Sequence, residues 1–124
     1  PGTYHFVQEN VVHEEEWRVS MHVWSDMDTR FYVKELISAL DWAHSKGVMH
    51  RDMKAANVLI NHAERKLKLI DWGLSDFYRY GHPNALGMGT RSTQAPELFL
   101  LNPYYDYSLD MWCVLAVFSC FVLN

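Results

Sequence analysis

Residues 50–73, with the sequence HRDMKAANVLINHAERKLKLIDWG, constrain this chain more than any other segment. Asp52, Asn57 and Asp71 follow one another there, and Lys54 stands between the first two. Carboxylate and amide oxygens are hard ligands, of the kind that Mg²⁺ takes when it also binds the phosphates of a substrate. A carboxylate two residues before a lysine suits a base that orients a hydroxyl group beside a cation that contacts phosphate. The four residues therefore indicate phosphate chemistry with a divalent metal.

The same segment predicts a β-hairpin. Residues 58–60 and 67–70 are short apolar segments that the sequence NHAERK joins, as in two paired strands. Asn57 would lie at the start of this hairpin and Asp71 at its end. Strand pairing alone would then bring together two metal ligands that are distant in the sequence.

Two longer helices are predicted on either side of the hairpin. The first begins at a capping box of Ser25 and Asp28 and ends at Gly47. The apolar residues that recur at helical spacing, and so define its expected core face, are Val33, Leu36, Ile37, Leu40 and Ala43. The second helix covers residues 106–123. From Met111 onward it is apolar on every side, so it should be buried all round.

The remaining segments predict shorter or irregular structure. Residues 74–93 contain three glycines and a proline, which is typical of a long loop, and long loops in compact domains tend to be functional. Residues 94–97 mark the start of another ordered segment. Either Asp106 or Ser108 would cap the last helix. Two short elements are also expected near the N-terminus, a strand over residues 4–7 and a helix over residues 14–21.

Composition narrows the class of protein. With 124 residues the chain is one domain at most, and 49% hydrophobic residues suit a packed core. A net charge of −4 argues against a nucleic-acid surface and against an anionic membrane. Cys113 and Cys120 lie seven apart in an apolar run, which indicates buried thiols on one helix face in a reducing compartment. No signal peptide is visible, and residues 111–123 are too few to span a bilayer, so we expect an intracellular protein.

The motifs occur in the order of the landmarks of a eukaryotic protein kinase C-lobe: HRD with Asn57, then DWG, APE at residues 95–97, and a helix that carries Asp110. Within that superfamily the sequence resembles the catalytic (alpha) subunit of casein kinase II. The resemblance depends on Trp72 of DWG and on the runs HAERKLKLIDWGLSDFY, YDYSLDMW, RFY and GVMHRD. It implies an α+β fold, a mainly helical C-lobe fragment with a small β-hairpin that carries the catalytic loop and DWG.

The resemblance also implies a domain organisation. Residues 1–124 would be a partial protein kinase domain with a hinge at residues 8–13 and a C-lobe at residues 14–124, truncated at the central helix. The N-lobe would be absent, because no glycine-rich loop and no strand lysine for the nucleotide phosphates is found in the sequence. We therefore expect the isolated fragment to be inactive, although its family is one of protein serine/threonine kinases.

The implied reaction transfers the γ-phosphoryl group of ATP to a Ser or Thr hydroxyl of a protein. By resemblance, Asp52 would accept the proton of the substrate hydroxyl and Lys54 would steady the γ-phosphate. Asn57 and Asp71 would hold Mg²⁺. The residues that match the adenine-binding hinge and the apolar walls of the ATP slot are Glu9, Asn10, Val11, Leu59 and Ile70.

Three supporting residues are implied as well. Thr90 would brace the catalytic pair, Asp110 would hold the backbone of the catalytic loop, and Arg91 matches a basic residue of a family that prefers acidic substrates. The resemblance further implies protein substrates, a regulatory beta subunit and a location in nucleus and cytoplasm. Direct binding of nucleic acid or of a membrane is not expected.

Several substitutions relative to the family pattern leave other hypotheses open. Ala55 and Ala56 replace a dipeptide that contains proline, and Ser92 replaces an aromatic residue. Leu115 stands at a helix glycine and should overpack the core at a cost of roughly 1–3 kcal/mol. One alternative is a catalytically dead truncated paralogue that acts as a binding or decoy module. Another is a decaying gene copy without a stable product.

Overall fold

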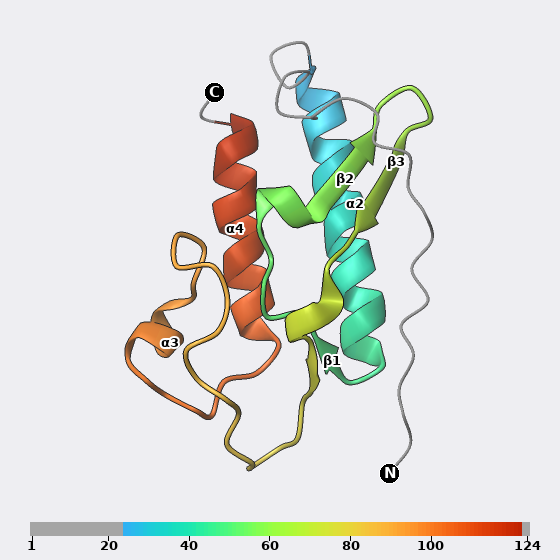
Figure 1. Cartoon of the computed structure of the whole chain (residues 1–124). Helices are drawn as coiled ribbons and strands as arrows, with labels where there is room; N and C mark the ends of the chain where they lie inside the picture. The colour runs from blue at the N-terminus through green and yellow to red at the C-terminus, as the bar shows by residue number, and fades with distance from the viewer. Residues whose placement is uncertain (1–23, 123–124) are drawn as a thin grey trace.

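The computed structural model describes residues 24–122, which form an α+β fold of helices and two small antiparallel sheets (Figure 1). The predicted fold class is therefore confirmed. The strand expected at residues 4–7, the hinge at residues 8–13 and the helix at residues 14–21 lie outside the described residues.

Helix α2 (Asp26–Ser45) begins and ends at the signals that predicted it. The Ser25 hydroxyl accepts a hydrogen bond from the Asp28 backbone N–H at 3.2 Å, and the Asp28 carboxylate accepts one from the Ser25 backbone N–H at 3.0 Å. At the other end, Gly47 has φ +80°, a conformation that costs glycine little. These local groups satisfy backbone donors and acceptors that a helix leaves free at its ends.

The buried face of α2 differs in part from the predicted one. Its buried residues are Tyr32, Leu36, Leu40 and Ala43. Ile37 is 40% exposed and Val33 is only half-buried, so their assignment to the core face was wrong. Tyr32, Leu36 and Leu40 follow one another at a spacing of four residues and therefore lie in one narrow stripe. That stripe forms the centre of the face that α2 turns to the core, and Phe31 packs against the same core from beside it. Apolar periodicity alone does not distinguish this face from the side that carries Ile37.

The predicted hairpin is present. Strand β2 (Val58–Asn61) pairs antiparallel with β3 (Lys66–Leu69) in a register that sets Val58 opposite Leu69. The 3₁₀ turn η2 (Ala55–Asn57) leads into β2. Beyond the ladder, the Ile70 backbone N–H donates to the Asn57 carbonyl at 2.9 Å, so pairing reaches the residue before Asp71.

A second small sheet was not predicted. Strand β1 (Val48–Met49) pairs antiparallel with β4 (Asp76–Phe77), and β4 lies within the segment that was expected to be an irregular loop. Two-residue strands are too short to show alternation, so periodicity could not indicate them. Farther along, α3 (Pro96–Phe99) forms within the predicted ordered segment, and η3 (Trp72–Leu74) follows Asp71.

Helix α4 (Ser108–Val122) contradicts the expectation of burial on every side. Asp106 caps it, since its Oδ1 accepts a hydrogen bond from the Ser108 backbone N–H at 2.8 Å. Met111 and Trp112 are exposed, and Leu115 is 63% exposed. The expected overpacking at Leu115 is therefore also wrong, because this side chain points away from the core that α4 shares with α2.

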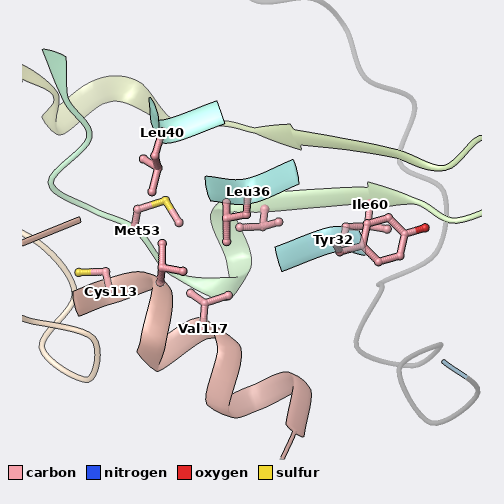
Figure 2. Close-up of a cluster of buried hydrophobic side chains, with 9 residues drawn as sticks. Tyr32, Leu36, Leu40, Met53, Ile60, Cys113 and Val117 are labelled. Carbon is pink, nitrogen blue, oxygen red and sulfur yellow. The ribbon is translucent and has the colours of Figure 1, made fainter. Parts of the chain in front are cut away.

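One hydrophobic core joins α2, the hairpin and α4 (Figure 2). Its buried residues are Tyr32, Leu36, Leu40, Met53, Val58, Ile60, Cys113, Val114 and Val117. A second cluster, beside α3 and the start of α4, contains Met49, Ala95, Leu98, Tyr105 and Leu109. Cys113 is a buried free thiol, and the side chain of Cys120 lies outside the described part of the chain. Between residues 24 and 122, no helix is long and apolar enough to cross a membrane.

Candidate active site

Asp52 lies between two partners that come from different parts of the chain. The residue is 6% exposed and follows β1 in the segment that leads to η2. Lys54 Nζ donates to Asp52 Oδ2 at 2.8 Å, and the Thr90 hydroxyl donates to Asp52 Oδ1 at 2.7 Å. Each carboxylate oxygen therefore has one strong donor, which fixes the rotation of the group.

These contacts determine the protonation of Asp52. Burial raises the pKa of this carboxyl, but the hydrogen bonds from Lys54 and Thr90 outweigh burial and hold the pKa below its ordinary value. The carboxylate is consequently ionised at neutral pH. A lone pair on either oxygen remains able to accept a further hydrogen bond, because an ionised carboxylate offers about four acceptor sites.

Asn57 lies beside Asp52. Its side-chain nitrogen donates to the Asp52 backbone carbonyl at 2.8 Å and approaches the Asp52 carboxylate at 3.4 Å. Because the nitrogen is held there, the amide oxygen points away from Asp52. A buried amide oxygen in a fixed direction is a ligand that a hard cation accepts.

Asp71 follows the hairpin and has a left-handed backbone conformation, with φ +60° and ψ +66°. Such a conformation is costly for a residue other than glycine and is often found at functional sites. The Asp71 side chain is exposed and makes no capping bond to η3. The backbone hydrogen bond from Ile70 to Asn57 holds the residue before Asp71 beside Asn57, the other predicted metal ligand.

The donor set of Asn57 and Asp71 suits Mg²⁺. It provides one amide oxygen and one carboxylate, and Mg²⁺ usually combines one or two carboxylates with water and substrate phosphates. Among the described residues, no group of three or more His, Cys, Asp or Glu side chains is placed to hold a metal ion.

Asp110 on α4 anchors residues 50–54, the predicted catalytic segment. Its side chain is fully buried, and its two oxygens accept hydrogen bonds from the backbone N–H groups of His50 and Arg51, each at 2.8 Å. The same carboxylate lies 2.9 Å from His44 Nε2 of α2. Arg51 has φ +67°, so Asp110 stabilises a strained backbone directly before Asp52.

The Arg51 side chain fixes the segment that follows Asp71. Its Nε donates to the Leu74 carbonyl at 2.7 Å. Nη1 lies 3.3 Å from the Asp76 carboxylate and 3.3 Å from the Tyr105 hydroxyl. The Arg51 guanidinium therefore binds three groups of the chain itself, which indicates that it stabilises the fold around residue 51.

The buried His50 side chain connects the backbone at Asp52 with the backbone at Ile70. Its Nε2 lies 3.1 Å from the Ile70 carbonyl, and its Nδ1 lies 3.3 Å from the Asp52 backbone nitrogen. Burial lowers the pKa of His50, so the ring is neutral at pH 7. Trp72 packs against it with ring centroids 4.6 Å apart.

The remaining predicted residues are less closely associated with this cluster. Leu59 and Ile70 are half-buried, and Leu59 lies on the opposite face of β2 from the buried Val58 and Ile60. Arg91 is exposed on the surface beside Thr90. The three predicted hinge residues, Glu9, Asn10 and Val11, lie outside the described residues.

Two groups at the site had no specific sequence signal. His44 contacts Asp110, but it was one of several scattered histidines in the sequence. Tyr105 contacts Arg51, but five tyrosines between residues 78 and 107 look alike without the fold. Both contacts join residues more than 50 positions apart, which no local pattern encodes.

Comparison with protein families gives a match over the whole chain. A family model described as "Protein kinase domain" matches residues 1–124.

Proposed function

The chain belongs to the protein kinase family, and from this premise we propose that it transfers the γ-phosphoryl group of ATP to a serine or threonine hydroxyl of a protein. The observation that carries the proposal is the ionised Asp52 carboxylate, held by Lys54 and Thr90 in one orientation. Phosphoryl transfer passes through a loose transition state, so positioning and charge neutralisation supply most of the catalysis.

Asp52 accepts a hydrogen bond from the substrate hydroxyl and then its proton. Because its pKa lies below the ordinary value, Asp52 is ready to accept at neutral pH without first losing a proton. Lys54 is partly exposed and uses one of its N–H groups on Asp52, so its other two remain available for a phosphate oxygen. One ammonium group therefore connects the base with the group being transferred.

Bound Mg²⁺ supplies neutralisation of the phosphate charge in this family. Asn57 Oδ1 and the Asp71 carboxylate would hold it, on the evidence of their donor chemistry and of the fixed Asn57 amide. Glu9, Asn10 and Val11 are proposed for the adenine, with Leu59 and Ile70 as apolar neighbours of the nucleotide.

The finer proposal is a kinase of the casein kinase II alpha type, supported by DWG at residues 71–73 and YDYSLDMW at residues 105–112. Its proposed substrates are proteins, acidic ones among them. A regulatory beta subunit is the proposed partner, and nucleus and cytoplasm are the proposed location.

The test uses the natural polypeptide that carries these residues. It is incubated with radiolabelled ATP, Mg²⁺ and a protein substrate, and the labelled amino acid is identified. Label on serine or threonine is expected. Label on tyrosine alone would overturn the Ser/Thr assignment, and ATP binding without transfer would favour the binding or decoy module.

A metal titration tests Asp71 in the same assay. Asp71→Asn should raise the Mg²⁺ concentration for half-maximal activity by roughly tenfold or more. Mutation of a group that binds a metal, or that supports a metal ligand, typically weakens metal affinity by at least about that factor. The matched control is Asp41→Asn, at an exposed position on α2. An unchanged Mg²⁺ requirement in Asp71→Asn would contradict its assignment as a metal ligand.

A further inference from the structure

We propose that the Tyr105 hydroxyl is a positioning group for this reaction, because it sets the place of Thr90 against Asp52. The proposal depends on the proposed phosphoryl transfer. The hydrogen bonds of the Tyr105 hydroxyl go to Arg51, Ala85 and Met88, so its influence on Thr90 and Asp52 passes through the segments that carry them.

Tyr105 is 3% exposed and lies in the second hydrophobic cluster. Its hydroxyl donates to the Ala85 carbonyl at 2.5 Å and accepts from Arg51 Nη1 at 3.3 Å. The Met88 sulfur is 3.7 Å from the same oxygen. This buried hydroxyl links Arg51 to Ala85. Its removal takes away the donor to the Ala85 carbonyl and leaves Arg51 Nη1 with the Asp76 carboxylate as its ion-pair partner.

The two partners belong to the two segments that meet at Asp52. Arg51 directly precedes Asp52 in the catalytic segment. Ala85 and Met88 belong to the loop that leads to Thr90, whose hydroxyl donates to Asp52. The contacts therefore close a ring that runs from Asp52 through Arg51 and Tyr105 to residues 85–88 and then through Thr90 back to Asp52.

Further contacts make this ring stiff. The Asn84 side chain donates to the Tyr105 carbonyl at 2.8 Å, and the Gln94 side chain donates to the Met88 carbonyl at 3.2 Å. At Gly89, an added Cβ would lie 2.9 Å from the Arg51 carbonyl, so the two segments already touch there. A loop fixed at several points holds Thr90 in a narrow range of positions, so the loss of one point should displace Thr90 by a small distance.

Loss of the hydroxyl should therefore shift Thr90 and release Asp52 Oδ1. Small misplacements of a catalytic group cost up to about 10²-fold in rate. The ATP ligands are not in the ring, so the effect should appear in kcat and not in the KM for ATP. This split distinguishes positioning from general loss of structure.

The experiment compares Tyr105→Phe with Tyr104→Phe in the natural polypeptide. Tyr104 is the neighbouring residue, and its side chain is largely exposed. Tyr105→Phe should lower kcat by about fivefold or more with the KM for ATP unchanged, whereas Tyr104→Phe should keep both. Combination of Tyr105→Phe with Thr90→Ala should give little further loss, because both changes release the same carboxylate oxygen.

Hydrogen exchange gives a second readout that does not require turnover. Amide exchange over residues 84–93 should be faster in Tyr105→Phe than in Tyr104→Phe. Equal kcat and equal exchange in the two variants, or fully additive losses with Thr90→Ala, would overturn the proposal. If the unmodified polypeptide transfers no phosphate, the proposed function fails, and exchange over residues 84–93 still decides whether the hydroxyl holds the loop.

Discussion

Two residues of the site adopt a left-handed backbone conformation, Arg51 with φ +67° and Asp71 with φ +60°. Each costs roughly 1–2 kcal/mol relative to an ordinary conformation. At Arg51 the cost is offset by Asp110, which accepts hydrogen bonds from two consecutive backbone N–H groups. The buried carboxylate thus stabilises the turn that presents Asp52, although it lies on another element.

Gly89 and Gly87 give a matched test of how tightly the loop packs on the catalytic segment. Gly87 has φ +80° and Gly89 has φ +85°, so both lie in the left-handed region. Of the two, only Gly89 would bring an added Cβ against a backbone atom, the Arg51 carbonyl oxygen at 2.9 Å. Gly89→Ala should therefore lower the free energy of unfolding more than Gly87→Ala, by about 1–3 kcal/mol, and should reduce turnover further. Urea unfolding of both variants, together with the kinase assay, checks this.

Gly87→Ala is the control for the backbone penalty, since nothing lies within 4 Å of its added Cβ. Equal losses in the two variants would show that the loop does not pack against the Arg51 carbonyl as described.

Asp52, Lys54 and Asn57 were singled out from the sequence as one motif, and they are at most five residues apart, so their proximity follows from their spacing. The bond from Thr90 to Asp52 joins residues 38 positions apart, and here only the resemblance to a family indicated it. Nothing in the sequence indicated the role of Tyr105, because its partners depend on how the loop folds back.

At the scale of single elements, the N-terminal cap of α2 depends on the ionised Asp28 carboxylate. The hydrogen bonds from the Ser25 side chain and backbone, with a contribution from Arg65, lower the pKa of Asp28 to about 2. Since the folded-state pKa is depressed, the stabilisation is fully present above the ordinary pKa of about 3.9 and is lost as the pH falls through about 2. The difference in unfolding free energy between the unmodified chain and Asp28→Asn should therefore shrink between about pH 4 and pH 2.

Urea unfolding at a series of pH values measures this difference. Asp26→Asn is the control, because Asp26 lies in the same first turn of α2 and takes no part in the capping box. A difference for Asp28→Asn that stays constant down to pH 2 would show that the cap does not depend on the ionised carboxylate.

Helix α4 provides a matched pair for the burial that the structure assigns. Val117 is 1% exposed in the core, whereas Leu115, two residues earlier, is 63% exposed. In the 124-residue chain, Val117→Ala should lower the free energy of unfolding by about 2 kcal/mol, since it removes buried methyl groups and leaves a cavity. Leu115→Ala should change it by less than about 0.5 kcal/mol. A larger loss at Leu115, measured by urea unfolding, would mean that this face of α4 is covered.

Short-range signals in the sequence were enough to predict which segments form helices or strands. They were not enough to predict which side of each element is buried. The capping box, Gly47 and the NHAERK connection each act within a few residues, so they indicated α2 and the hairpin correctly. The exposed side of α4 depends on what packs against it, and an apolar sequence does not say which side that is. For the same reason, Ile37 was wrongly placed in the core.

Across the molecule, the catalytic segment lies between two hydrophobic clusters. Met49 belongs to the cluster beside α3, and Met53 belongs to the core that α2, the hairpin and α4 share. The three polar residues between them are buried with hydrogen-bond partners, and Asp110 connects them to α4 and, through His44, to α2. The position of Asp52 therefore depends on the whole described fold, which explains why its chemistry could be predicted from the sequence and its surroundings could not.

The most direct measurement of the central claim is the phosphotransfer rate of Asp52→Asn in the natural polypeptide, beside the Asp41→Asn control. Asparagine keeps the size of the side chain but cannot accept the proton of the substrate hydroxyl. We predict that kcat falls by about 10²–10⁴-fold while the KM for ATP stays within about twofold. A kcat equal to that of the control would contradict the assignment of Asp52 as the base, and with it this account of the site.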